Sequence, residues 1–369
     1  MGDAFIAQCL SDIRSIPVRD FNECADVLLQ ALRRFDPNVL GTIRGADLLW
    51  ERAAELKIAP QGGCSANQSC RLMATQDGYI AVNLARPEDW TLLPAWLEAD
   101  VNNWSQLSAQ VAQRSSALLL ERGRLMGLAV ATPNEAIAPD PVDALSDLNA
   151  HIVTSPLVVD MSALWAGPLC SHLLQGCGYQ VIKVESVQRP DGAREGSPKH
   201  FYALHEGKEC RRFDFRDPTD LRRLRMLLAS ADVVIEGSRP RALRALELDR
   251  ESIMTGAGSV AAASHLWLSL TAYGRTSPFG DWVGFGDDVA IAAGAFDATQ
   301  ANAPAFIADA IADPLTGLLA AWLILQLRRR RMSGLIDFSL FRAANFCVNW
   351  LQDSGGALVS PTREPTLRC

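Results

Sequence analysis

The sequence lacks the short glycine-rich and serine-containing motifs of the common nucleotide-binding and hydrolytic enzymes. Its 369 residues contain no Gly-x-Gly-x-x-Gly fingerprint, no Gly-x-x-x-x-Gly-Lys-Ser/Thr loop and no Gly-x-Ser-x-Gly elbow. A dinucleotide-dependent enzyme, a P-loop NTPase and a serine hydrolase are therefore not supported. Only 5 histidines occur, and none lies in a hydrolytic motif. We expect structural roles for them, with His205 and His265 the strongest candidates for chemistry.

Paired cysteines and long apolar runs are also missing. The 9 cysteines are irregularly spaced without a Cys-x-x-Cys pair, which is typical of reduced thiols in a cytoplasmic protein. Cys64 and Cys70 have no His or Cys partner at zinc spacing, so no metal site is predicted. The most apolar segment, Gly317–Leu327, is about half as long as a membrane span. It predicts a buried helix, and no membrane partner or signal peptide is expected.

The charge pattern gives no sign of a nucleic-acid surface. The net charge is −7 with a pI near 5.4, and the basic residues are scattered except for the run Arg328–Arg331. We therefore expect no nucleic-acid partner. An anionic ligand would need a local basic pocket.

The first part of the chain alternates between helical and strand-like patterns. Apolar residues at three- and four-residue spacing predict helices, and a strand, turn, strand pattern follows them around Asp77-Gly78. The helices are expected over 25–35, 45–56, 88–97 and 104–126, and the strands over 70–84 and 128–131. The prolines and acids of residues 133–147 predict an exposed linker.

The second part has the pattern of a parallel α/β sheet. A buried strand at 157–161 is followed by a turn with Ala166-Gly167-Pro168, a helix and a second buried strand at 180–185. Later strands at 232–236 and 266–271 extend this βαβ unit. A Rossmann-like parallel sheet flanked by helices is therefore expected, with ligands at the carboxyl ends of its strands.

Three groups of residues could carry chemistry at that edge. The turn at residues 162–168 leads into a helix amino terminus, which favours anions, although an ordinary tight turn explains it too. A set of basic residues could hold a phosphate or form a solvated surface; it comprises Lys208, Arg211, Arg212, Arg239, Arg241 and Arg244. Asp313, four residues after Asp309, could be a tuned carboxylate or the cap of a helix with Pro314 at its first position.

The order of four segments resembles the class III CoA-transferase family. They cover residues 159–185, 208–243, 268–288 and 313–339. The resemblance implies a Rossmann-like large domain, a smaller α+β domain and an interlocked homodimer. It implies acyl-CoA and a carboxylic acid acceptor as substrates, with no permanently bound cofactor. In the family's transferases an Asp in a D-x-x-x-G pattern is the nucleophile, and here that pattern is Asp313 with Gly317.

The resemblance also carries binding residues onto this sequence. Coenzyme A contacts are implied at Trp165, Ala166, Lys208, Gly237, Ser238, Arg239 and Arg244. The Arg that usually follows the second strand is displaced to Arg189. Racemases of the family carry a His where this chain has Asp287, so the two-base arrangement is altered. Asp287 and His265 are the candidates for a second acid or base.

The halves of the family pattern come in reversed order. Residues 71–97 resemble a segment that ordinarily follows the large-domain half. We therefore expect an N-terminal domain over 1–132, a linker over 133–155, a CoA-binding domain over 156–345 and a C-terminal tail over 346–369. Circular permutation would explain this order.

Three functions are compatible with these residues. The first is an acyl-CoA transferase that moves coenzyme A between carboxylic acids through an aspartyl-anhydride and an aspartyl-CoA thioester on Asp313. The second is an acyl-CoA racemase or isomerase acting at the α-carbon. The third is an inactive CoA-binding or scaffolding member of the family.

Overall fold

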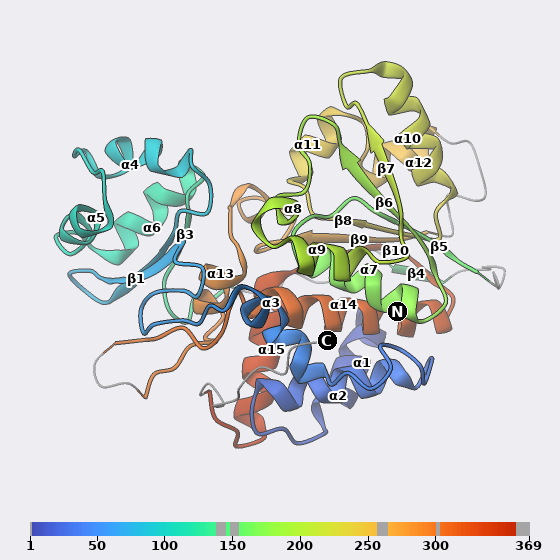
Figure 1. Cartoon of the computed structure of the whole chain (residues 1–369), viewed down its shortest axis with the longest axis horizontal. Helices are drawn as coiled ribbons and strands as arrows, with labels where there is room; N and C mark the ends of the chain where they lie inside the picture. Colours follow the sequence, from blue (N-terminus) through green and yellow to red (C-terminus); the bar gives the residue numbers. More distant parts are fainter. Residues whose placement is uncertain (1, 138–144, 148–154, 257–264, 300–302, 359–369) are drawn as a thin grey trace.

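The computed structural model of the chain describes residues 2–137, 145–147, 155–256, 265–299 and 303–358. They form a large α/β unit and a smaller unit that stands to one side of it (Figure 1). Within these ranges no helix is both long and apolar enough to cross a membrane. The 8 cysteines in the same ranges are all free thiols.

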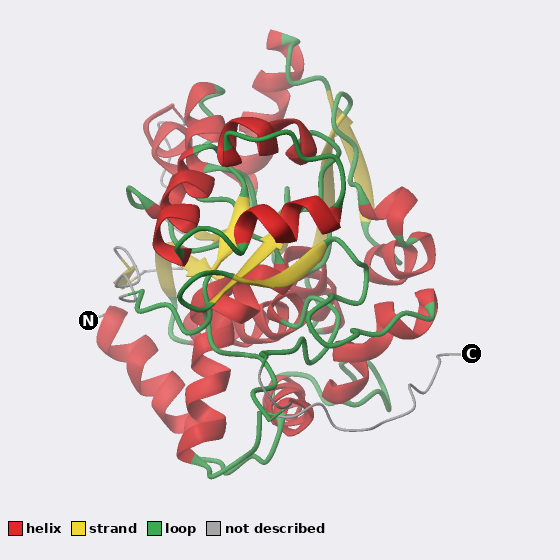
Figure 2. Ribbon diagram, turned by 90° about the vertical axis from the view of Figure 1, so that its left-hand side faces the viewer, coloured by secondary structure: helices red, strands yellow, loops and turns green. Residues whose placement is uncertain are grey.

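The large unit is built on a seven-stranded sheet with helices on both faces (Figure 2). In spatial order its strands are β4 (Leu145–Asp147), β10 (Met332–Ser339), β9 (Leu266–Thr271), β8 (Val233–Glu236), β5 (Leu157–Asp160), β6 (Gln180–Ser186) and β7 (Glu209–Phe213). All neighbouring pairs are parallel except β10 with β4. The predicted parallel α/β sheet is confirmed.

Both faces of the sheet are apolar because its strands are buried on both sides. In β5, Val158 packs into the core on one face and Val159 into the core on the other. The helices that follow β5 in the large unit are α7 (Ala166–Gly176), α8 (Ala193–Gly196), α9 (Pro198–His205), α10 (Pro218–Ser230), α11 (Pro240–Ala245), α12 (Arg250–Gly256), α13 (Gly286–Ala292), α14 (Ala312–Arg329) and α15 (Leu340–Asp353).

Helix α14 is the buried helix that the apolar segment predicts. Nearly every residue from Ala312 to Leu325 is buried, because α7, α2 and α15 pack around it. A helix that is apolar on all sides is stable in water only in such a core.

The small unit is an antiparallel sheet covered by short helices. Its strands are β1 (Cys70–Ala74), β2 (Tyr79–Asn83) and β3 (Ala129–Ala131), and its helices are α4 (Asp89–Leu97), α5 (Trp104–Val111) and α6 (Ser116–Leu125). The hairpin at Asp77-Gly78 is as predicted. The single helix expected over residues 104–126 is wrong, since α6 restarts after Ser115, whose hydroxyl accepts the Leu118 N–H as a cap.

The predicted division of the chain differs from the packing. Helices α1 (Gly2–Arg14), α2 (Phe21–Arg33) and α3 (Gly45–Leu56) belong to the large unit, where Leu28 and Leu32 of α2 enter the same core as α14 and α15. Figure 1 shows α1 and α2 beside these two C-terminal helices. The expected boundary at residue 345 falls inside α15, and the expected linker contains β4. Composition alone does not reveal packing partners so distant in sequence.

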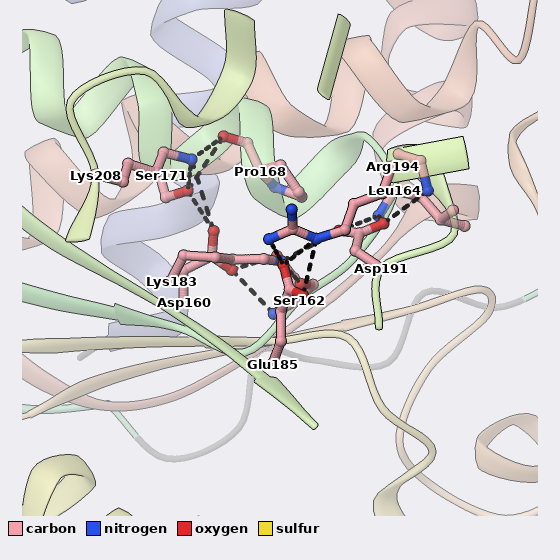
Figure 3. A network of polar contacts seen from close by, with 11 residues as sticks. Asp160, Ser162, Leu164, Pro168, Ser171, Lys183, Glu185, Asp191, Arg194 and Lys208 are labelled. Atoms are coloured by element: carbon pink, nitrogen blue, oxygen red, sulfur yellow. Dashed lines mark hydrogen bonds and ion pairs between the residues drawn. The ribbon is translucent and has the colours of Figure 1, made fainter. Parts of the chain in front are cut away.

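A buried polar network fixes the turn between β5 and α7 (Figure 3). Asp160, at the end of β5, accepts hydrogen bonds from Ser162 and from the Ser171 hydroxyl at 2.5 Å. Burial alone would raise the pKa of Asp160, but Lys183, Lys208 and these hydroxyls hold it below its usual value.

Lys183 and Asp191 hold the other side of the same turn. The Lys183 ammonium donates to the Ser162 carbonyl oxygen and lies 3.2 Å from the Asp191 carboxylate. Asp191 in turn accepts the Leu164 N–H at 3.0 Å. Because both charges are fully buried, the pair fixes the backbone that leads to Ala166.

We expect Lys183→Met to destabilise the fold by about 3 kcal/mol or more, because it leaves the carboxylates of Asp160 and Asp191 buried without their shared cation. Urea denaturation followed by circular dichroism measures the change. Arg211→Met is the matched control, since Arg211 pairs with Glu209 on the exposed edge strand, and exposed pairs contribute about 0–1 kcal/mol. Equal losses in the two variants would contradict a structural role for the network.

Candidate active site

The candidate site lies where α7 meets α14. Gly317 allows this contact, because a Cβ atom there would lie 2.8 Å from the Ala166 carbonyl oxygen and 3.0 Å from the Leu169 Cβ. Such distances are too short for any side chain. The close approach brings the first turn of α14, which carries Asp313, to the amino terminus of α7.

Asp313 does not cap its own helix, so the helix-cap interpretation is wrong. Helix α14 begins at Ala312, with Ile311 at the cap position. The Asp313 carboxylate instead lies near the backbone N–H groups of Ala166 and Gly286, at the starts of α7 and α13, and both N–H groups favour its ionised form. Burial raises the pKa of Asp313 to about 6, opposed by Arg52 and by these N–H groups. The residue as a whole is partly exposed, although burial dominates the environment of its carboxyl group.

Gly286 is required by this geometry. A Cβ atom at Gly286 would lie 2.1 Å from the Asp313 Oδ2 and 2.6 Å from the Ala310 carbonyl oxygen. The start of α13 is fixed by Asp288, whose Oδ1 accepts the Phe285 N–H at 3.0 Å. Asn83 of the small unit donates to the same oxygen at 2.8 Å. The small unit therefore supports one of the N–H donors to Asp313.

Asp287 follows Gly286 on α13 and is in a different state from Asp313. Its side chain is buried, and its Oδ1 accepts the Ala310 N–H at 2.8 Å. Burial and the nearby Asp309 carboxylate raise the pKa of Asp287 to about 8. Asp287 is therefore mostly protonated at neutral pH, whereas Asp313 is mostly ionised. The two carboxyl groups can serve as an acid and a nucleophile.

Two further residues, Arg52 and Asp309, lie at the site. Arg52 is outside the predicted set, and Asp309 has no predicted role. Arg52, on α3, donates to both oxygens of Asp309, from Nε at 2.7 Å and from Nη2 at 2.6 Å. Its guanidinium lies 4.7 Å from the centre of the Trp165 ring. Arg52 occupies an ordinary polar position of an amphipathic helix, so no sequence signal distinguishes it.

Trp165 and Ala166 are brought to the site as predicted, but in different ways. The Trp165 ring is 1% exposed and packs edge-on against His200 at 5.0 Å between ring centres. The ring forms a wall of the site and packs against the Arg52 guanidinium. Ala166 contributes its backbone N–H to Asp313.

Two of the predicted site residues lie elsewhere. Lys208 is buried beneath α7, where its ammonium donates to the Pro168 carbonyl oxygen at 2.9 Å and to the Ser171 hydroxyl at 2.7 Å. Its place there is structural, and burial lowers its pKa to about 7. This placement favours a structural role for Lys208 over the predicted ligand contact, since two of its donors are used inside the protein.

His265 lies at the opposite edge of the sheet from Asp313. It precedes β9, next to Asp232 at the start of β8, whereas the residues before α13 contact Ala272 just after β9. Six residues of strand separate the two ends, or about 20 Å. His265 is therefore not placed to act as an acid or base with Asp313.

The remaining predicted residues gather after β6 and β8 at the carboxyl edge of the sheet. Gly237 lies against Ser162, and Ser238 donates its N–H to Glu236 at 2.9 Å. Arg239 follows directly, and Arg244 is exposed on α11. Their position is the ligand edge of an open parallel sheet.

Arg239 stands in a group of guanidinium side chains. Burial, together with the positive charges of Arg86, Arg241 and Arg189, lowers its pKa. The nearest opposing charge on Arg241 is Asp281, at 3.7 Å between exposed side chains. A cluster of like charges that is only partly neutralised is suited to a phosphate group.

The described residues contain no group of three or more His, Cys, Asp or Glu side chains arranged to hold a metal ion. The chemistry that these residues can supply is that of an ionised carboxylate with two N–H donors, a protonated carboxyl group beside it and a basic cluster along the same sheet edge.

The chain is similar to curated CoA-transferases over part of its length. It is 28% identical over 141 residues to a succinate–glutarate CoA-transferase of Agrobacterium fabrum, covering 35% of this chain and 34% of the relative. It is 28% identical over 199 residues to a succinyl-CoA–D-citramalate CoA-transferase of Chloroflexus aurantiacus, covering 50% and 48%. A succinyl-CoA:glutarate CoA-transferase of Mus musculus is 28% identical over 204 residues, with 52% and 46% covered. The chain thus spans about half or less of the length of these relatives.

Among solved structures, a CAIB/BAIF family protein from Brucella suis is 28% identical, with a TM-score of 0.47 over 55% of this chain and 58% of that chain. The family model described as CoA-transferase family III matches residues 156–363. This match includes α7, α13 and α14, and with them Asp313 and its two N–H donors. Because it covers more than half of the chain, the chain belongs to CoA-transferase family III.

Proposed function

We propose that the chain is an acyl-CoA transferase that moves coenzyme A between carboxylic acids, with Asp313 as the nucleophile. The observation that carries the proposal is the setting of Asp313, a partly exposed residue whose carboxylate lies near the Ala166 and Gly286 N–H groups. Such donors orient a carboxylate for attack and stabilise negative charge that develops beside it.

The proposed reaction proceeds by exchange at Asp313. The carboxylate attacks the thioester carbonyl of the donor acyl-CoA, forming a mixed anhydride and releasing the CoA thiolate. The thiolate then attacks the aspartyl carbonyl, which gives an aspartyl-CoA thioester and the free donor acid. The acceptor carboxylate repeats these two steps in reverse, so that the acceptor leaves as its CoA thioester and Asp313 is regenerated.

The basic cluster supports a binding mode for coenzyme A. Arg189 follows β6 and Arg239 follows β8 at the sheet edge where ligands of this fold class bind, and Arg244 lies in the last turn of α11. The phosphates would lie against this cluster, and the pantetheine arm would run past Gly237 and Ser238 towards Asp313. We also propose that the protein is a homodimer, as the family resemblance implies.

The site favours transfer over racemisation. A racemase needs two groups that exchange a proton with the α-carbon. His265 lies at the opposite sheet edge, which leaves Asp287 as the predicted candidate for a second base, and the relatives that the chain resembles are named as transferases. Wash-in of deuterium at the α-carbon without acyl exchange would support the racemase instead. Binding of coenzyme A without any chemistry would support the inactive family member.

Trapping should reveal a covalent intermediate on Asp313. The relatives are named for succinyl and other dicarboxylic acids, so succinyl-CoA is the first donor to use. Incubation with the donor and hydroxylamine should convert Asp313 to its hydroxamate, which peptide mass spectrometry detects. Asp313→Asn should give no adduct and lose transfer by a factor of about a thousand or more. Full activity in that variant would exclude Asp313 as the nucleophile.

The rate of transfer should fall in acid as Asp313 takes up a proton. Because the pKa of Asp313 is raised to about 6, the nucleophilic carboxylate is mostly present at pH 7. Its fraction decreases about tenfold for each pH unit well below pH 6. Initial rates of acyl exchange between pH 4.5 and 8 measure this dependence. A rate that stays constant down to about pH 4.5 would show that a normal, exposed carboxylate performs the reaction.

Removing a guanidinium from the basic cluster should weaken the binding of coenzyme A. We expect Arg239→Ala to raise the dissociation constant about tenfold, which corresponds to the loss of one charge-assisted contact. Isothermal titration calorimetry measures the change. Arg222→Ala, on the exposed side of α10, is the control and should bind as the unmodified protein does. Equal affinities in both variants would place the phosphates elsewhere.

A further inference from the structure

The Arg52–Asp309 ion pair is enclosed at the edge of the candidate active site. Its two hydrogen bonds use both carboxylate oxygens of Asp309, which is fully buried, and two of the guanidinium nitrogens of Arg52, whose side chain is 18% exposed. The Trp165 ring lies against the guanidinium face. A bidentate pair held against an aromatic ring has a single geometry.

Helix α3 is itself fixed, so Arg52 is not a mobile surface arginine. One turn after Arg52, the Glu55 carboxylate accepts the N–H groups of Lys199 and His200 at 3.0 and 2.6 Å. These two residues lie in the first turn of α9. Glu55 thus caps α9 and holds α3 in place, and His200 packs edge-on against Trp165.

The charged groups around Asp313 are few and can be named. Arg52 stacks on Trp165, the residue before Ala166, and acts on Asp313 from α3. Asp309 acts on it from four residues earlier in the chain, and Asp287 on α13 neighbours Asp309 and Arg52. Helix α7 contributes the Ala166 N–H. Behind the Trp165 ring, His200 lies 4.0 Å from Glu51.

The Arg52 guanidinium therefore interacts electrostatically with three carboxyl groups, those of Asp309, Asp313 and Asp287. Arg52 lowers the pKa of Asp313, whereas Asp309 raises it. Because Asp309 binds two of the guanidinium nitrogens, it controls how much of the positive charge of Arg52 acts on Asp313.

We propose that Arg52 and Asp309 form a positioning pair that sets the charge state of the Asp313 carboxyl group. The pair acts through Asp313 and does not itself react. This inference rests on the proposed function only where it concerns the rate of transfer, since the charge of Asp313 can be measured without a substrate. Arg52 lies outside residues 156–363, which match the family, so it is contributed by the N-terminal helices of this chain.

The two members of the pair should act in opposite directions. Arg52→Gln removes the cation and should raise the pKa of Asp313 by about one unit, towards 7. Asp309→Asn removes the competing anion, which leaves Arg52 to act on Asp313, and should lower that pKa by about one unit. A residue that merely supports the fold would not give opposite displacements.

The experiment is a titration of Asp313 in the full chain. The rate of carbodiimide labelling at Asp313, measured by peptide mass spectrometry across a pH series, reports the protonated carboxyl group. We expect the labelling midpoint to rise in Arg52→Gln and to fall in Asp309→Asn. Arg52→Lys keeps the charge and should lie between the unmodified protein and Arg52→Gln. At pH 5, transfer in Arg52→Gln should be about tenfold slower than in the unmodified protein.

The matched control is Arg328→Gln. Arg328 is a partly buried arginine paired with Asp232 at 3.1 Å, and it lies at the far end of α14, ~22 Å from Asp313 along the helix. Loss of this ion pair should leave the labelling midpoint of Asp313 unchanged. Circular dichroism melts check that all variants are folded at the labelling temperature.

The outcomes separate the two proposals. Opposite displacements in Arg52→Gln and Asp309→Asn support the positioning pair, even if no protein transfers coenzyme A, in which case only the proposed function fails. Displacements in the same direction, or none in either variant, overturn the positioning pair, even if transfer through Asp313 is intact. Folded Asp309→Asn and Arg52→Lys are sufficient for this decision if Arg52→Gln does not fold.

Discussion

The structure of the site depends on the close approach of three helix amino termini around one carboxyl group. Helices α7, α13 and α14 begin at Ala166, Gly286 and Ala312, and Asp313 lies among them. Helix amino termini favour negative charge, and two of these helices also direct a backbone N–H at the carboxylate. The approach is possible only because Gly286 and Gly317 have no side chain, since a Cβ atom at either would overlap an oxygen atom.

The buried charges beneath β5 serve this arrangement. The backbone between β5 and α7 has no regular structure to define it, and Lys183, Asp160 and Asp191 bond it from below. Burying these charges costs desolvation free energy. Their bonds to the turn give the Ala166 N–H a fixed direction. The same logic applies to Asp288, which fixes the start of α13 with help from Asn83 of the small unit.

Differences in burial and charge divide the roles of the two carboxyl groups. Asp287 is buried beside Asp309 and has its pKa raised to about 8, whereas Asp313 has two N–H donors and Arg52, which hold its pKa near 6. At neutral pH one group therefore keeps its proton and the other has lost it. Identical side chains can in this way carry different chemistry within one site.

The sequence predicts the elements of the fold better than their contacts. Apolar runs and periodicity are local signals, so the parallel strands and the buried helix α14 are predicted from them. The pairing of Arg52 with Asp309 joins positions far apart in the chain, and no local pattern marks it. The places of Lys208 and His265 cannot be predicted for the same reason. A polar residue near a strand end can point into the core, or it can lie at the sheet edge opposite the site. The family resemblance supplied Asp313, and only the structure excluded a helix cap there.

The central claim is that Asp313 exchanges oxygen with its substrates during transfer. In the proposed reaction the bridging oxygen of the second anhydride comes from the acceptor acid and stays on Asp313 when the thiolate attacks the acceptor carbonyl. The direct measurement is turnover with an acceptor whose carboxylate carries heavy oxygen, followed by mass spectrometry of the peptide that contains Asp313. The account predicts that this peptide gains one heavy oxygen atom in the first turnover and a second in later turnovers, both located on Asp313. Turnover that leaves the peptide unlabelled would contradict it.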